Sequence, residues 1–183
     1  MGLSAEEEAL RSVTCCFTGH RGIGEEQQRC LKQRLSRLLE QLYQQGYRRF
    51  YSGGALGLDL LAAEAVIDLR GSHADVQLLL ALPCEEQTRR WPAAERERQG
   101  RLKTLADHCV TLSPHYYNGC MMVRNRHMVD RSSLCVCYLT HMRGGTLSTV
   151  RYALGEGLPC INLAMDEALT AGEAGQPPPD PAR

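Results

Sequence analysis

The chain has 183 residues, of which 43% are hydrophobic and 23% charged, and its formal net charge is zero. This length and composition predict one globular domain, and the balanced charge argues against a protein that coats nucleic acid through its overall electrostatic field. With two phenylalanines and one tryptophan in the chain, aromatic platforms for stacking single-stranded bases are also scarce.

No apolar stretch approaches the roughly 20 residues that a membrane span requires. Near the N-terminus, Glu6, Glu7 and Glu8 stand where a secretory signal would need basic residues, so we expect a cytoplasmic protein without a membrane partner. The nine cysteines are an odd number, and the pair Cys135 and Cys137 has no second pair at zinc spacing. We therefore expect reduced, mostly buried thiols and no metal site.

Apolar runs of strand length alternate with segments of helical periodicity along the chain. The expected strands are 13–18, 48–52, 76–82, 108–112, 134–138 and 159–163. The expected helices are 25–45, 58–69, 93–106, 121–130 and 146–155, the first of them marked by leucines at helical spacing and closed by Gly46. Strands separated by helices predict a mainly parallel sheet with helices on both faces. The Pro-rich residues 171–183 are expected to form a disordered tail.

Three glycine-rich turns lie beside apolar runs. They are Phe17-Thr18-Gly19-His20-Arg21-Gly22, Tyr51-Ser52-Gly53-Gly54-Ala55-Leu56-Gly57-Leu58-Asp59 and Arg143-Gly144-Gly145-Thr146. Glycine at a strand-to-helix turn allows a positive φ and leaves backbone N–H groups uncovered. Three such turns in one α/β pattern predict a single crevice that offers phosphate-sized anion sites at the carboxyl ends of the strands.

Five motifs in a fixed order carry a family resemblance. They are Thr18-Gly19-His20-Arg21; Ser52-Gly53-Gly54-Ala55 with Gly57 and Asp59; Pro83 with Gln87 and Trp91; Arg124-Asn125 with Met128-Val129-Asp130; and Gly144-Gly145-Thr146 with Thr149-Val150 and Tyr152-Ala153. From about Val13 to Leu163 the chain resembles the YpsA-like family of the SLOG superfamily, which joins the Smf/DprA DNA-processing proteins and the LOG phosphoribohydrolases. The resemblance implies a Rossmann-like three-layer α/β/α sandwich and a nucleotide-type ligand related to ADP-ribose. It also leaves room for a homodimer, because SLOG relatives often pair through helices.

These motifs define the candidate site, in one nucleotide-binding domain over residues 1–170. We expect nucleotide contacts from Gly19, His20, Arg21, Ser52, Gly53, Gly54, Ala55, Asp59, Arg124, Asn125, Asp130, Gly144, Gly145 and Thr146. No catalytic residue is assigned. The LOG enzymes carry a glutamate three residues after the threonine of the last turn, and Thr149 stands at that position, where it cannot act as a carboxylate base.

Several of these residues have a structural interpretation beside the functional one. Gly53 and Gly54 either hold phosphate or let a helix pack close to the sheet. Arg21 either contacts the ligand or pairs with Asp59 or Asp130. Asp59 either accepts ribose hydroxyls or favours a helix N-terminus by its charge. Arg124 either reads the ligand or locks a helix to a loop.

Three further features also have both a functional and a structural interpretation. Trp91 with Gln87 forms either a lid over the base or packing at the rim of the sheet, and we favour packing. The basic stretch from Arg89 to Lys103 is interspersed with glutamates, which indicates a solvated helix face more than a nucleic-acid groove. The aromatic loop 115–119 either covers the site or is plain surface.

Together these patterns predict a protein that binds a nucleotide or nucleotide derivative in a glycine-rich crevice, as a sensor or regulatory protein. One alternative is a hydrolase of nucleotide N-glycosidic bonds resembling the LOG enzymes, which the missing glutamate argues against. A second is a DNA-handling accessory resembling DprA, which the zero net charge argues against. Nucleic acid is therefore not the expected partner.

Overall fold

The computed structural model describes residues 4–165 and 168–169. Its centre is one sheet with strand order β4-β3-β2-β1-β5-β6-β7. The strands are β1 (Thr14–Gly19), β2 (Arg49–Ser52), β3 (Gln77–Leu82), β4 (His108–Thr111), β5 (Leu134–Tyr138), β6 (Cys160–Asn162) and β7 (Ala168–Leu169). The first six strands are parallel and β7 pairs antiparallel with β6. The predicted Rossmann-like α/β fold is therefore confirmed.

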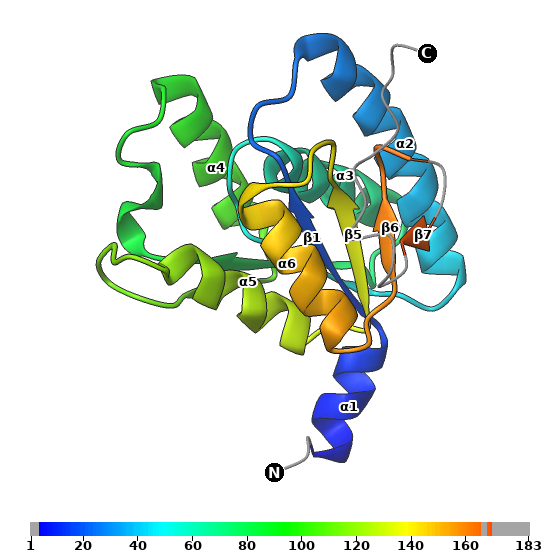
Figure 1. Ribbon diagram of the computed structural model, residues 1–183. Coiled ribbons are helices and arrows are strands. Elements are labelled where there is room, and N and C mark those ends of the chain that lie inside the picture. The colour runs from blue at the N-terminus through cyan, green and yellow to red at the C-terminus, as the bar shows by residue number, and fades with distance from the viewer. Residues whose placement is uncertain (1–3, 166–167, 170–183) are drawn as a thin grey trace.

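Helices cover both faces of this sheet. They are α1 (Ala5–Ser12), α2 (Glu25–Gln44), α3 (Leu58–Ser72), α4 (Ala93–Leu105), α5 (Cys120–Asp130) and α6 (Gly144–Gly155), with a 3-10 turn at Glu85–Thr88. In Figure 1, α5 and α6 lie in front of the sheet and α3 lies behind it, and α2 and α4 each pack against α3. None of the helices among the described residues is both long enough and apolar enough to cross a membrane.

Two buried clusters hold these layers together. Behind the sheet, Leu31, Leu35, Leu39 and Leu42 of α2 recur at helical spacing, and all four are at most 2% exposed. In β1, the side chain of Cys15 belongs to this cluster, while that of Cys16 faces the cluster under α5 and α6, because successive side chains of a strand point to opposite faces. All nine cysteines lie in the described part, none forms a disulfide, and seven are buried, as expected.

The strand order indicates at which edge of the sheet a ligand would bind. From β1 the chain moves outward through β2, β3 and β4, and it then returns to the other side of β1 for β5 and β6. The direction of winding therefore reverses between β1 and β5. In open α/β sheets, ligands bind outside the carboxyl ends of the strands at such a switch point.

The structure adds three elements that were not expected, which are α1, the 3-10 turn and β7, and it shifts a few ends. Helix α1 buries none of its residues, and its eight residues include one large apolar side chain, Leu10, which is too few for periodicity to detect. Its signal is a capping box, in which Ser4 and Glu7 bond each other's backbone N–H groups. The two-residue strand β7 is too short for any periodicity, and α6 begins two residues earlier than expected. The expected tail, residues 171–183, lies outside the described residues.

Candidate functional site

The first two glycine turns form one interlocked unit at the carboxyl ends of β1 and β2. Gly57 has φ +84° and ψ −127°, and a Cβ atom there would meet the carbonyl oxygen of His20 and lie 2.7 Å from the Cα atom of Arg21. A Cβ atom on Gly19 would lie 2.5 Å from the Cβ atom of Leu58. The Leu58 amide also donates to the His20 carbonyl oxygen at 3.4 Å. These turns are glycine-rich because one backbone packs directly against the other.

The second turn is closed by its own hydrogen bonds. The Ser52 hydroxyl donates to the Asp59 carbonyl oxygen at 2.8 Å and accepts the Gly54 amide at 3.1 Å. The Ala55 amide donates to the Asp59 carboxylate at 3.4 Å. Gly54 has φ +59°, and a Cβ atom there would point at the Leu82 side chain, 2.9 Å away. The predicted phosphate contacts of the Gly54 and Ala55 amides would therefore require these internal bonds to be exchanged.

Arg124 connects this turn to α5. Its guanidinium Nη1 donates to the Gly53 carbonyl oxygen and lies 3.5 Å from Asp59 Oδ2, and both side chains are about 5% exposed. Burial raises the pKa of Asp59, an effect that the neighbouring Arg124 charge counteracts, and burial lowers the pKa of Arg124. These contacts support the interpretation that Arg124 locks a helix to a loop. They also give Asp59 a partner other than Arg21.

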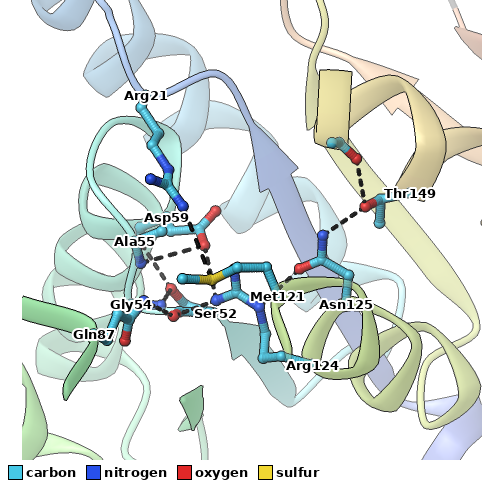
Figure 2. Close-up of polar contacts among 12 residues, drawn as sticks. Arg21, Ser52, Gly54, Ala55, Asp59, Gln87, Met121, Arg124, Asn125 and Thr149 are labelled. Carbon is cyan, nitrogen blue, oxygen red and sulfur yellow. Dashed lines mark hydrogen bonds and ion pairs between the residues drawn. The ribbon is translucent and has the colours of Figure 1, made fainter. Parts of the chain in front are cut away.

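The same network continues to the third turn (Figure 2). Arg124 Nε donates to Asn125 Oδ1 at 2.7 Å, and Asn125 Nδ2 donates to Thr149 Oγ1 at 2.7 Å. The Thr149 hydroxyl in turn donates to the Gly145 carbonyl oxygen at 2.8 Å. This chain of bonds, which we call the edge network, fixes the second turn relative to the start of α6. Thr149, at the position of the LOG glutamate, is 1% exposed and occupied by both bonds.

The third turn differs from the other two because it is open. Helix α6 begins after Arg143, and among the described residues no side chain caps its first N–H groups. Gly144 has φ +84°, and a Cβ atom on Gly144 or Gly145 would meet nothing within 4 Å. Both glycines are exposed, while Thr146 is 7% exposed. Uncapped amides at a helix N-terminus attract anions through their N–H groups and the helix dipole.

Two histidines bridge the switch point beside this turn. The rings of His20, after β1, and His141, after β5, stack with centroids 3.7 Å apart. Burial, with a smaller effect from His141, lowers the pKa of His20 to about 4, so its ring is neutral at pH 7. Its Nε2 atom is buried without a hydrogen-bond partner among the described residues. Sequence reasoning missed His141, although its place after a central strand is a usable signal.

Arg21 and Asp130, both predicted to contact the nucleotide, lie at opposite edges of the sheet. Arg21 is exposed at the crevice, and its guanidinium lies 3.9 Å from the Met121 sulfur atom. Asp130 lies away from the crevice, so its predicted nucleotide contact stays a prediction that this position does not favour. Its carboxylate accepts from the Tyr152 hydroxyl at 2.8 Å, and it lines a separate cavity with Thr14, at the start of β1. Helix α5 runs from the carboxyl edge of the sheet to the amino edge, and Asp130 is its last residue.

The remaining features have structural roles. Gln87 donates to the Gly53 carbonyl oxygen at 3.1 Å, and Trp91 packs against the core behind the sheet, as favoured from the sequence. In the basic stretch, Arg89, Arg98 and Arg101 each pair with a glutamate. The loop that contains Tyr116 is exposed. The described residues contain no group of three His, Cys, Asp or Glu side chains able to hold a metal ion.

Comparisons with known proteins agree with this architecture. Residues 16–153 match the family described as the YspA SLOG family (YpsA). The prophage-derived protein YoqJ of Bacillus subtilis is 27% identical over 163 residues, covering 78% of this chain and 95% of its own length. The UPF0398 protein YpsA of Bacillus subtilis is 25% identical over 150 residues, covering 76% of this chain and 79% of its own.

A solved structure is similar in fold. DNA processing protein A from Helicobacter pylori, described for its single-stranded DNA binding mode, superposes with a TM-score of 0.59 at 18% identity, over 86% of this chain and 67% of that one. At this identity the likeness concerns the fold. The family match covers most of the described residues, so the chain belongs to the YspA SLOG family.

Proposed function

We propose that this protein binds a nucleotide or nucleotide derivative of the ADP-ribose type, as a sensor or regulatory protein. The phosphate would lie on the first amides of α6, next to the β1/β5 switch point. The observation that carries this proposal is the open third turn, where no described side chain caps the start of α6 and a Cβ atom on Gly144 or Gly145 would meet nothing within 4 Å. The exposed Arg21 supplies positive charge at the same edge of the sheet, beside Met121 of α5, and the unpartnered His20 Nε2 atom supplies a polar group there.

The edge network supports this placement by rigidity. A site that binds without reorganising needs its donors held in position before the ligand arrives. The bonds from Arg124 through Asn125 and Thr149 to the Gly145 carbonyl oxygen hold the α6 start against the second turn. In this proposal, Asp59, Arg124 and Asn125 position the site without contacting the ligand.

The test is thermal stability with a panel of AMP, ADP-ribose and free adenine. A ligand that binds only the folded state stabilises it by RT ln(1 + [L]/Kd), about 2.7 kcal/mol at 100 times Kd. We expect AMP and ADP-ribose to raise the melting temperature and adenine to leave it unchanged. Gly145→Asp, which places a carboxylate at the anion site, should abolish the shift. Gly155→Asp is the matched control, because it adds the same charge at the far end of the same helix, where a Cβ atom would also meet nothing within 4 Å. A flat melting temperature with every nucleotide at millimolar concentration would contradict the proposal.

Base release from nucleotides is the second candidate function, and the geometry disfavours it. The Thr149 side chain is buried and bonded on both sides, so the third turn offers no carboxylate to stabilise a ribosyl cation. Incubation with AMP should therefore yield no adenine by chromatography. Enzyme-dependent release of adenine would replace the binding proposal with the hydrolase.

DNA binding is the third candidate, favoured by the fold of DNA processing protein A. Three arginines of the basic stretch are paired with glutamates, which leaves less free positive charge for phosphate contacts. A gel shift with a single-stranded oligonucleotide across a salt series tests it. Retardation that weakens steeply with salt would establish DNA as a partner.

A further inference from the structure

A cavity of about 400 Å³ lies at the carboxyl ends of β5 and β6, on the side of the sheet covered by α2. Tyr138, the last residue of β5, and Thr140 in the following loop line one wall, and Glu26 and Cys30 of α2 line the other. Its volume is within the range of small-molecule sites. No residue of this cavity belongs to the predicted nucleotide contacts.

The lining combines buried apolar residues with exposed polar ones. Leu31 and Leu163 are buried, and Ala164 is a small apolar residue beside them. Arg34 Nη1 donates to the Leu163 carbonyl oxygen at 2.7 Å, which fixes α2 to the end of β6. The carboxylate of Glu26 lines the exposed rim. A flat heterocycle suits this combination, because its faces are apolar and its edge carries hydrogen-bonding groups.

The cavity and the open turn share one loop. Thr140 lines the cavity, and Arg143, three residues later, is the N-cap of α6. Three residues span at most about 10 Å, a distance that a nucleoside monophosphate can bridge. Helices α2 and α6 lie on opposite faces of the sheet (Figure 1), so such a ligand would cross the edge between β1 and β5. There the His20 amide donates to the Tyr138 carbonyl oxygen at 3.3 Å.

We infer that this cavity holds the base of the nucleotide whose phosphate lies on the α6 N-terminus. The inference rests on the proposed function and adds the ligand's orientation and class, which is a nucleoside phosphate with an amino-bearing base. The amino group would donate to the Glu26 carboxylate at the rim. The ribose would cross the switch point beside the His20 and His141 rings.

The chain contains a reporter for this geometry. Cys30 lines the cavity and is exposed, Cys109 on β4 is exposed at the far edge of the sheet, and the other seven cysteines are buried. Maleimide labelling of the wild-type protein, followed by peptide mapping, reads both thiols in one sample. AMP at ten times its Kd should slow labelling of Cys30 about tenfold and leave Cys109 unchanged. Ribose 5-phosphate, which lacks the base, should protect neither thiol.

The outcomes separate this inference from the proposed function. If AMP raises the melting temperature and the labelling rate of Cys30 is unchanged, the base lies elsewhere and the inference fails while the function stands. Equal protection of Cys30 by ribose 5-phosphate would also overturn it. If AMP changes neither quantity, both proposals fail.

A cavity-filling variant gives an independent readout. Ala164→Trp should lower the affinity for AMP to that for ribose 5-phosphate, because the indole occupies the space of the base, and it should leave the affinity for ribose 5-phosphate unchanged. Ala94→Trp, at an exposed position of α4, is the matched control. Circular dichroism and the melting temperature verify that both variants fold. Full AMP affinity in folded Ala164→Trp contradicts the inference.

Discussion

Replacing Gly57 by alanine tests the contact between the first two turns. A side chain at φ +84° and ψ −127° lies in a region populated almost only by glycine, which costs about 1–3 kcal/mol. The new Cβ atom would overlap the His20 carbonyl oxygen and lie 2.7 Å from the Arg21 Cα atom. These are backbone atoms and cannot move aside by rotamer changes, so the hydrogen bond from the Leu58 amide to His20 should be lost, at about 0.5–1.5 kcal/mol.

Together these terms predict a loss of about 1.5–4.5 kcal/mol in the free energy of unfolding, measured by urea titration with the melting temperature as a second readout. Gly145→Ala is the matched control, since its Cβ atom would meet nothing within 4 Å and its φ is not positive. As a helical position it should be neutral or gain up to about 1 kcal/mol. A Gly57→Ala protein within 0.5 kcal/mol of wild type would show that the two turns are not in the contact described.

Two further predictions concern buried charge. Arg124→Met should cost about 3–5 kcal/mol because it leaves the Asp59 carboxylate buried without its cation. In the double variant, Asp59→Asn should restore part of the lost free energy of unfolding. Strictly additive effects of the two substitutions in urea titrations would show that the two groups do not interact. His20 has a folded-state pKa of about 4, below its ordinary value of 6.5, so the unfolded chain takes up a proton first as the pH falls. Stability should therefore decrease from about pH 6.5 towards pH 4, and His20→Gln should weaken that decrease; an identical pH dependence in both proteins would contradict the assignment.

The local sequence pattern was sufficient to predict most of the helices and strands and the edge of the sheet at which the candidate site lies. Leucines at helical spacing predicted α2, because one face of that helix must be buried whatever it packs against. The alternation of strands and helices predicted parallel strands, and parallel strands bring their carboxyl ends, with the glycine turns, to one edge. Helix α1 was missed because its eight residues carry one large apolar side chain, so they form no repeat of helical spacing.

The sequence by itself therefore determined the layered fold, the three turns and the edge they share, since these follow from periodicity and glycine along the chain. The tertiary structure alone decided which turn is open. What a glycine permits depends on the atoms facing its absent side chain: Leu82 for Gly54, the His20 backbone for Gly57, and free space for Gly145. The tertiary structure also decided that Arg124 lies at the crevice and Asp130 at the opposite edge of the sheet. Six residues of helix α5 separate the two by about 9 Å along the helix axis. These partners come from distant parts of the chain, so no local pattern specifies them.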